Sequence, residues 1–233
     1  MARRVSEVSV VIPTMNEEAS IGQVIDEVRQ ALGDRVLEIL VVDTNSKDRT
    51  REIAASKGAR VIAEPRRGYG RAYKTGFAEA RGTFIATLDA DLTYPADRLR
   101  DFLDALESGR ADFVSGDRMS HLDRGAMSGM HRIGNAILNM SFRALFGVPI
   151  QDSQSGMWAF RRDILPRLRL AHDGMAFSEE LKVEVILSGF RFLEIPVQYR
   201  VRVGDRKIRS LRDAAKNLLW LARKRVGWYL SSR

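Results

Sequence analysis

Short apolar runs alternate with helix-like segments along the first half of this chain, and this alternation most limits the folds open to it. The runs are rich in β-branched residues and short enough for buried strands, at residues 8–12, 37–42, 60–63, 84–88 and 113–115. Apolar residues at three- and four-residue spacing predict helices between them, at residues 20–32, 48–57, 70–80 and 97–107. The alternation predicts an α/β fold, a Rossmann-like, mostly parallel sheet flanked by helices, with right-handed crossovers.

The pattern changes after residue 120. We expect a helix over residues 125–146 at the sheet edge, a short strand over 156–160, a helix over 178–187 capped by Ser178, and a strand over 191–199. No linker rich in Pro, Gly or Ser interrupts the chain, and no internal repeat is present. The expected organisation is one catalytic domain over residues 1–209, followed by a cationic amphipathic C-terminal helix over residues 210–233.

Composition excludes several classes of protein. The 233 residues are 45% hydrophobic and 29% charged, which is typical of a globular domain and not of a disordered chain. The chain has no cysteine, so it forms no disulfide or thiolate metal site, and this fits a reducing compartment. No segment reaches the roughly 18 to 20 apolar residues that span a bilayer, and Pro13 ends the first apolar run too early for a signal peptide. We therefore expect a cytoplasmic protein.

The positive charge is concentrated at the C-terminal end. The net charge is +8, and residues 200–233 hold 11 Lys and Arg against 2 Asp and Glu, a net +9, so residues 1–199 carry −1. A nucleic-acid binder more often spreads its basic groups over the folded face that contacts phosphates. The asymmetry favours a localised anionic partner such as a membrane surface, and we expect no nucleic-acid partner.

Polar residues follow four of the expected strands. In sheets of this type, ligands bind at the carboxyl ends of the strands. The sequences there are Pro13-Thr14-Met15-Asn16-Glu17-Glu18, Asp43-Thr44-Asn45-Ser46, Asp89-Ala90-Asp91 and Gly116-Asp117-Arg118. We expect the functional site at this edge of the sheet.

Asp89 and Asp91 are the sharpest candidates for metal binding. Two carboxylates at a strand end can reach one ion if the backbone turns there, and oxygen ligands suit Mg²⁺ or Mn²⁺ bound to a diphosphate. The alternative is that one Asp caps the helix after Pro95 and the other is solvated. Asp43, at the end of the second strand, can accept hydrogen bonds from a nucleoside, or it can serve as a helix cap.

Two common nucleotide-binding devices are missing from the sequence. The first strand is followed by Pro13 and not by a glycine-rich turn, and no Gly-Lys-Ser/Thr string exists. The loop Arg66-Arg67-Gly68-Tyr69-Gly70-Arg71 precedes a helix, so its glycines and arginines, Arg71 included, can bind anionic groups, although it can also be an ordinary basic loop. His121, His131 and His172 match no zinc motif. Trp158 is expected in the core or in the wall of an acceptor pocket.

Taken as an ordered set, these motifs resemble those of family 2 inverting glycosyltransferases with the GT-A fold. The matching stretches are residues 8–18, Val41-Val42-Asp43 with Asn45, Ser46 and Asp48, Gly70-Arg71-Ala72 with Gly76, and Asp89-Ala90-Asp91 with Pro95. A second set resembles the dolichol-phosphate mannose synthase branch, which includes polyprenyl-phosphate hexosyltransferases. It comprises Asp152-Ser153-Gln154-Ser155-Gly156 and Glu194-Ile195-Pro196-Val197, followed by Arg202, Gly204 and Lys207. Together the matches span about residues 8–210.

The resemblance implies a nucleotide-sugar donor, Mg²⁺ or Mn²⁺ and a polyprenyl-phosphate acceptor. It assigns Asp89-Ala90-Asp91 to the metal–diphosphate site, Asp43 to the nucleoside, and Pro13 and Glu17 to the wall of the nucleotide pocket. Three residues depart from the family pattern: Thr44 replaces a second Asp, Thr93 replaces a metal-binding Gln, and Arg206 replaces a Ser beside Lys207. The donor base stays open between UDP and GDP, with the Gly68-Tyr69-Gly70 loop favouring UDP.

The implied acceptor determines which catalytic groups are needed. A lipid phosphate is anionic at neutral pH and can attack the anomeric carbon without a general base, in one inverting displacement. Arg118 or Arg132, with Arg202 and Lys207, would hold the acceptor phosphate or the donor diphosphate. A soluble hydroxyl acceptor would instead need a base, for which Asp152, Glu179 and Glu180 are candidates. A non-catalytic nucleotide-sugar or anionic-surface binding module is a further alternative, disfavoured because both acids of the Asp pair are present.

The C-terminal segment combines an apolar face with basic residues. Leu211, Leu218, Leu219 and Val226 recur at helical spacing, and Arg212, Lys216, Arg223 and Lys224 lie on other sides of the helix. Such a helix can lie in the membrane interface, giving a peripheral contact at the cytoplasmic face, with Trp220, Trp228 and Tyr229 at the headgroups. It can also be a terminal helix packed on the domain with a solvated basic face.

Overall fold

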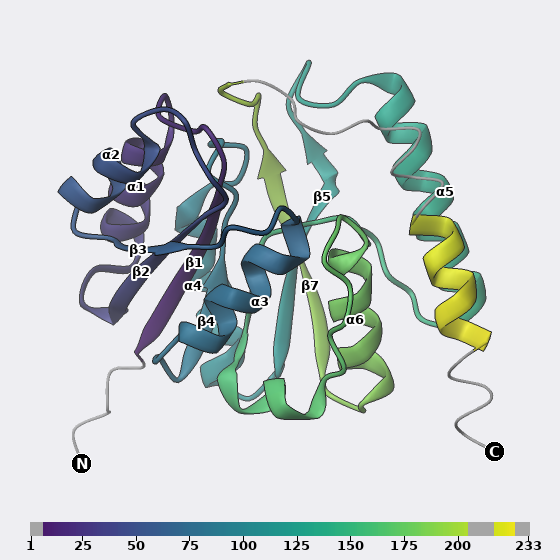
Figure 1. Cartoon of the computed structure of the whole chain (residues 1–233). Coiled ribbons are helices and arrows are strands. Elements are labelled where there is room, and N and C mark those ends of the chain that lie inside the picture. Colours follow the sequence, from purple (N-terminus) through teal and green to yellow (C-terminus); the bar gives the residue numbers. More distant parts are fainter. Residues whose placement is uncertain (1–6, 205–216, 227–233) are drawn as a thin grey trace, which may run out of the picture.

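A computed structural model describes residues 7–204 and 217–226. Its centre is a seven-stranded sheet in the order β3-β2-β1-β4-β6-β5-β7 (Figure 1). The strands are β1 (Val8–Thr14), β2 (Val36–Asp43), β3 (Arg60–Ala63), β4 (Phe84–Thr87), β5 (Phe113–Leu122), β6 (Trp158–Arg161) and β7 (Phe192–Tyr199). β1 pairs in parallel with β2 and β4, β2 with β3, and β5 with β7, whereas β6 runs antiparallel to β4 and β5. The mostly parallel sheet predicted from the sequence is confirmed.

Helices cover both faces of this sheet. They are α1 (Ile21–Leu32), α2 (Thr50–Ser56), α3 (Tyr69–Glu79), α4 (Leu99–Glu107), α5 (Gly129–Phe146) and α6 (Phe177–Leu187), with short 3-10 turns at Gly33–Arg35, Ala96–Arg98 and Arg162–Arg167. Val10 and Ile12 of β1 pack with residues of α1 and α4, and Val11 between them packs with residues of α3 and α6. Successive side chains of a strand point to opposite faces, so a continuous apolar run fills two core layers.

α3 lies close against the sheet because position 76 is a glycine. A Cβ atom on Gly76 would lie 2.4 Å from Cγ1 of Val11 on β1 and 3.1 Å from Cγ2 of Val42 on β2. This close approach holds the start of α3 near the carboxyl ends of β1 and β2. Tyr69 and the basic loop before it are thereby positioned beside the strand ends.

Two local expectations were wrong. β5 continues to Leu122, so Asp117 and Arg118 lie within a strand and not after one. The pairing of β5 with β7 is irregular between Asp117 and His121, where Asp117 accepts hydrogen bonds from the backbone of Met119 and the hydroxyl of Ser120. A bulge re-aims side chains within a continuous strand, which local sequence patterns do not reveal. Ser178 is not a cap, because α6 already begins at Phe177 and Ser178 is buried in its first turn.

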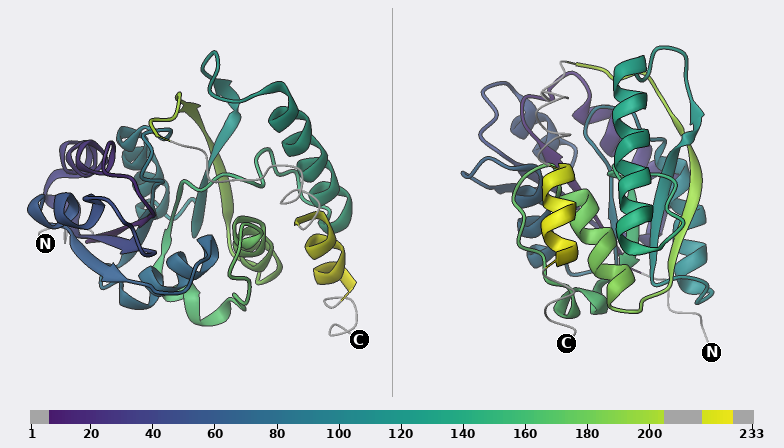
Figure 2. Two further views of the ribbon diagram at one scale, coloured as in Figure 1. Left: turned by 45° about the horizontal axis from the view of Figure 1, so that its top comes forward. Right: turned by 90° about the vertical axis from the view of Figure 1, so that its right-hand side faces the viewer.

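A third apolar cluster joins α5, α6 and the C-terminal helix. Residues 217–226 are helical, and Leu221 is fully buried with Leu138 and Phe142 of α5 and Val183 of α6. Both α5 and this helix lie on one side of the molecule, the side that faces the viewer in the right panel of Figure 2. Within the described part of the chain, no helix is long and apolar enough to cross a membrane.

Candidate functional site

A cavity of about 440 Å³ opens at the carboxyl ends of β1, β2 and β4 and extends to α5. One end is polar and carries the acids and arginines predicted from the sequence. The other end is formed by the first half of α5 and the segment before it. The residues lining the cavity include Pro13, Glu17, Thr44, Arg67, Tyr69, Asp89, Asp91, Tyr94, Arg118, Met127, Met130, His131, Leu138, Gln154, Tyr199, Arg202 and Asn217. Several of the residues predicted at this edge of the sheet therefore line one cavity.

Asp89 and Asp91 both line this cavity, because the chain turns sharply after β4. Leu92 has a φ of 64°, a left-handed conformation that few residues with a Cβ adopt. Ala90 between the two acids is buried in the core and is not among the described residues that line the cavity. Burial and the charge of Asp91 raise the pKa of Asp89 above its ordinary range, while Arg202 and Arg118 oppose this.

Asp91 is held by three groups. The backbone N–H and the hydroxyl of Thr93 donate to its Oδ1 at 3.1 and 2.6 Å, so Thr93 orients the carboxylate. One Nη atom of Arg202 lies 3.0 Å from Oδ2 of Asp91, and the other lies 3.1 Å from Oε1 of Glu17. Arg202 thus bridges two acids that the sequence separates widely, and it neutralises charge inside the cavity.

The segment after β7 is fixed across the site by backbone hydrogen bonds. The N–H of Arg200 donates to the carbonyl of Thr93, and the N–H of Val203 donates to the carbonyl of Asp91. Arg200 also pairs with Glu27 of α1. Arg202 is positioned between these two contacts, which explains how a residue far along the chain reaches the paired acids.

Tyrosines and a glycine form the floor beneath Asp89. The hydroxyls of Tyr69 and Tyr73 lie 3.5 and 3.4 Å from its Oδ1. The N–H of Gly156 donates to the Tyr94 hydroxyl, and a Cβ on Gly156 would lie 2.3 Å from the Tyr69 hydroxyl. Only glycine fits at position 156, which explains why the predicted Asp152-to-Gly156 motif ends as it does.

Pro13 and Glu17, which the resemblance assigns to the wall of a nucleotide pocket, line the cavity together with Thr44. Asp43 is buried below it, with its carboxylate accepting from the hydroxyl of Thr14 and from the N–H and hydroxyl of Ser46. In this arrangement Asp43 braces the loop after β2. It does not cap a helix, because α2 begins only at Thr50 and its N-cap residue is Arg49. Thr44, and not Asp43, is among the described residues that line the cavity.

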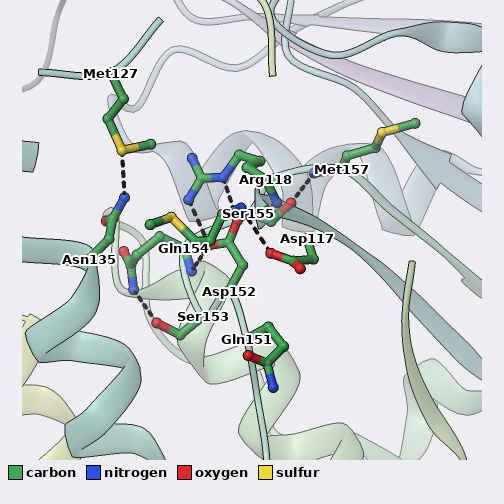
Figure 3. Close-up of polar contacts among 12 residues, drawn as sticks. Asp117, Arg118, Met127, Asn135, Gln151, Asp152, Ser153, Gln154, Ser155 and Met157 are labelled. Atoms are coloured by element: carbon green, nitrogen blue, oxygen red, sulfur yellow. Dashed lines mark hydrogen bonds and ion pairs between the residues drawn. The ribbon is translucent and has the colours of Figure 1, made fainter. Parts of the chain in front are cut away.

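Arg118 and Asp152 form a buried bidentate ion pair (Figure 3). Nε and Nη2 of Arg118 donate to the two carboxylate oxygens at 2.6 and 2.8 Å, and the backbone N–H of Arg118 adds a third bond at 3.0 Å. Although burial opposes ionisation, the charge and hydrogen bonds of Arg118 hold the pKa of Asp152 below its ordinary value. Asp152 is therefore a poor general base, and it orients Arg118 at the cavity wall.

Lys182 supports this pair from below. Its ammonium donates to the backbone carbonyls of Asp152 and Ser155 at 2.6 and 3.3 Å. Burial lowers the pKa of Lys182 to about 8. No sequence pattern pointed to this role, since lysine side chains are usually solvated.

The two other predicted base candidates are buried in α6. Glu179 accepts from the Gln154 side chain at 2.6 Å, and burial raises its pKa to about 8. Glu180 accepts the backbone N–H groups of Ala171 and His172 and fixes that loop. Gln154 lines the cavity and in turn accepts from Asn217 at 3.1 Å, which links α6 to the C-terminal helix.

The remaining predicted residues have varied positions. Arg67 of the basic loop lines the cavity, whereas Arg71 pairs with the buried Glu64 at 2.9 Å. Arg132 is exposed on α5, outside the described residues that line the cavity. Lys207 and Arg206 lie outside the described residues. His131 lines the cavity near the hydroxyl of Ser128, and His172 accepts from the N–H of Gly174.

Comparisons with known proteins agree with this geometry. The family model described as Glycosyl transferase family 2 matches residues 9–169. The chain belongs to glycosyl transferase family 2. It is 36% identical to the low-salt glycan biosynthesis hexosyltransferase Agl6 of Haloferax volcanii over 96% of this chain and 55% of that protein. It is 35% identical to a dolichyl-phosphate hexose transferase of the same organism, over 87% of this chain and 86% of that protein.

A solved structure shares the fold. Glucosyl-3-phosphoglycerate synthase of Mycobacterium tuberculosis, crystallised with Mn²⁺, UDP-glucose and phosphoglyceric acid, has a TM-score of 0.76 and 26% identity, covering 95% of this chain and 80% of that chain. This family 2 glycosyltransferase therefore has the GT-A fold that the sequence motifs implied. The chain spans only 55% of the length of the hexosyltransferase Agl6.

The residues of this glycosyltransferase fit a divalent cation that is shared with a ligand. Among the described residues, no group of three or more His, Cys, Asp or Glu gathers into a self-contained metal site. The carboxylates of Asp89 and Asp91 do face one cavity, and the charge of Asp91 contributes to the raised pKa of Asp89. Two oxygen ligands that leave most coordination positions open suit Mg²⁺ or Mn²⁺ completed by a diphosphate.

Proposed function

We propose that this chain transfers a hexose from a nucleotide sugar to a polyprenyl phosphate, with inversion and with Mg²⁺ or Mn²⁺. The observation that carries the proposal is one cavity with two chemically different ends. Asp89 and Asp91 stand at the strand end of this cavity, which three arginines also line. Met127, Met130 and Leu138 line the α5 end, beside His131 and Asn135. The first end suits a metal-bound diphosphate, and the second suits the first isoprene units of a lipid. A relative named for dolichyl-phosphate hexose transfer, at 35% identity, supports this reading.

The residues divide the work between binding and charge compensation. Asp89 and Asp91 would hold the cation, which supplies positive charge to the departing nucleoside diphosphate. Arg202 and Arg118 place further positive charge near the phosphates of donor and acceptor. A phosphate oxygen of the acceptor forms the new bond to the anomeric carbon while the bond to the donor diphosphate breaks. Orientation of the two substrates is the main contribution of the protein.

The carboxylates near the cavity support a phosphate acceptor over a soluble hydroxyl acceptor. Asp152 is committed to Arg118, and Glu179 is buried against Gln154. A hydroxyl would need one of them, or His131 in the cavity wall, to remove its proton. The pH profile of turnover separates the two readings. If the acceptor is a phosphate, the fall of turnover at low pH should be the same in His131→Gln as in the unmodified chain. If that fall disappears in His131→Gln, a hydroxyl acceptor with His131 as its base is favoured.

A donor and acceptor screen tests the proposed function directly. UDP-glucose, UDP-N-acetylglucosamine and GDP-mannose are each incubated with a short-chain polyprenyl phosphate and Mg²⁺ or Mn²⁺, and products are identified by mass. We expect a glycosyl phosphate product with one of these donors and none in EDTA. Transfer to a soluble hydroxyl compound, with no product on the lipid phosphate, would contradict the proposal.

We also infer a peripheral contact with the cytoplasmic face of the membrane through residues 210–233. The acceptor is lipid-borne, the basic charge is concentrated in this segment, and the absence of cysteine fits a reducing compartment. Leu218, Leu219 and Val226 are exposed even though Leu221 of the same helix is buried. The packed and the membrane-contacting alternatives are thus compatible, because different faces of the helix serve each.

A further inference from the structure

The outer face of α5 exposes large apolar side chains in a row. Met130, Ile133, Ile137 and Met140 are 60, 60, 47 and 63% exposed. At 3.6 residues per turn their directions fall within about 80° of the helix circumference, so they form one stripe. We call these four residues the α5 face. They account for four of the ten large apolar side chains found exposed in the described part of the chain.

The α5 face is distinct from the side of α5 that packs on the core. α5 buries Leu138 and Phe142 on its opposite side, against Leu221 and Val183. A helix with one buried and one exposed apolar face has a second partner to contact. A soluble helix of this length would ordinarily carry charged residues on its outward side.

The charged residues of α5 itself are all arginines. The helix contains Arg132 and Arg143 and no Asp or Glu. Both arginines are exposed and lie along one border of the stripe. On the neighbouring helix, residues 218, 219 and 226 are exposed and apolar, and Arg223 is exposed beside them. Apolar residues flanked by cations match the surface of an anionic lipid leaflet.

The α5 face is also continuous with the cavity. Met130 is 60% exposed and still lines the cavity, together with Met127 and Leu138. A surface seated against α5 would therefore meet the apolar end of the cavity at the first turn of the helix. Asp89 and Asp91 lie in the same cavity.

We propose that the α5 face is a membrane-docking surface that inserts into an anionic leaflet and opens the apolar end of the cavity to lipid. This inference assigns the membrane contact to α5 in addition to the C-terminal helix. The identity of the lipid that enters the cavity rests on the proposed function. The docking itself needs neither donor nor acceptor. It can therefore be measured separately from transfer.

The first test is vesicle binding by a variant with a polar α5 face. Ile133→Gln, Ile137→Gln and Met140→Gln are combined, since none of these residues lines the cavity. Binding to phosphatidylglycerol and phosphatidylcholine vesicles is expected to fall by about tenfold or more. Leu37→Gln changes an equally exposed leucine, 44% exposed at the start of β2, and should leave binding unchanged. Unchanged binding by the triple variant would overturn the proposal.

The second test reports insertion at α5 itself. Because the chain has no cysteine, Ile137→Cys provides a single site for an environment-sensitive fluorophore. We expect a blue shift when anionic vesicles are added, and none from a label at Leu37→Cys. If the emission of the label at position 137 does not shift when the protein is bound to vesicles, docking through α5 is contradicted. A dimer that disappears in the triple variant, with vesicle binding intact, would assign the face to a second copy of the chain.

The third measurement separates docking from catalysis. The triple variant is assayed with a short-chain, water-soluble polyprenyl phosphate, and its turnover should equal that of the unmodified chain. With long-chain acceptor in vesicles, its turnover should fall along with binding. If the unmodified chain binds vesicles through α5 but transfers no hexose to any acceptor, the proposed function fails while the docking surface stands.

Discussion

The carboxylate of Asp91 is oriented and partly neutralised by its neighbours. Thr93 orients it, Arg202 pairs with it, and the neighbouring Asp89 has a raised pKa. Two carboxylates facing one cavity are costly unless a cation compensates them. Arg202 supplies part of that compensation, and a divalent cation would supply the rest.

Replacement of Asp91 tests the metal role. In Asp91→Asn the amide oxygen can still accept from Thr93, so the fold should survive. We expect turnover to fall on the order of 100-fold, because the leaving diphosphate loses charge compensation. Mn²⁺ binding in the presence of the nucleoside diphosphate, measured by calorimetry, should weaken in parallel. Full activity in EDTA would exclude the metal role.

Glu179 predicts a pH dependence of stability. Its pKa is raised from 4.5 to about 8 in the folded chain, so the folded state binds more protons than the unfolded state between these values. Its contribution to stability is complete below pH 4.5 and is lost as the pH rises to about 8. Glu179→Gln retains the acceptor for Gln154 and should flatten this decline. Chemical denaturation between pH 5 and 8 measures it, and an unchanged slope would contradict the assignment.

At the scale of elements, the third apolar cluster couples the C-terminal helix to the cavity. Leu221 packs between α5 and α6, and Asn217 bonds to Gln154 in the cavity wall. α5 is thus held from its inner side by elements that also shape the cavity. A change in the packing of the C-terminal helix would alter the hydrogen bond between Asn217 and Gln154.

Truncation of Leu221 measures the strength of this coupling. Leu221→Ala removes a fully buried side chain and should destabilise the packing of the helix by about 2 to 5 kcal/mol. Limited proteolysis should then cut the C-terminal segment faster, and the KM for donor should rise as Gln154 loses its partner. Leu219→Ala, at a position 52% exposed, should change stability by no more than about 0.5 kcal/mol. Equal protease resistance of the two variants would argue against the coupling.

At the scale of the whole molecule, the charge is divided between a nearly neutral catalytic region and a basic C-terminal segment. Residues 200–233 carry a net +9 and the rest carries −1. Such a division gives the molecule a preferred orientation toward an anionic surface. The α5 face and residues 217–226 lie on the same side, as Figure 2 shows for the two helices.

Neutralising charges in the C-terminal segment should weaken vesicle binding selectively. Arg212→Gln, Lys216→Gln and Arg223→Gln together remove about 3 kcal/mol of attraction, or roughly 100-fold in affinity, at low salt. The loss should shrink as salt increases. Lys47→Gln, Arg49→Gln and Arg81→Gln, which remove three exposed charges elsewhere, provide the control. Similar losses in both triple variants, measured by sedimentation, would show that total charge and not its position matters.

The sequence by itself determined the strands, the helices and the edge of the sheet that holds the site. Apolar periodicity reports which face of an element is buried, and parallel strands bring the acids at their carboxyl ends together. Asp89 and Asp91 follow from this strand-end position, and the family resemblance added Pro13 and Glu17. All four residues line the cavity.

Only the tertiary structure decided which side chains pair. Arg118 reaches Asp152 because a bulge re-aims β5, and Arg202 reaches Asp91 because backbone bonds hold the segment after β7 across the site. Lys182 is buried under Asp152, although lysine side chains are usually solvated. Periodicity is a local property, whereas ion pairs and pKa values depend on groups brought together from distant parts of the chain. Chain folding alone sets those distances.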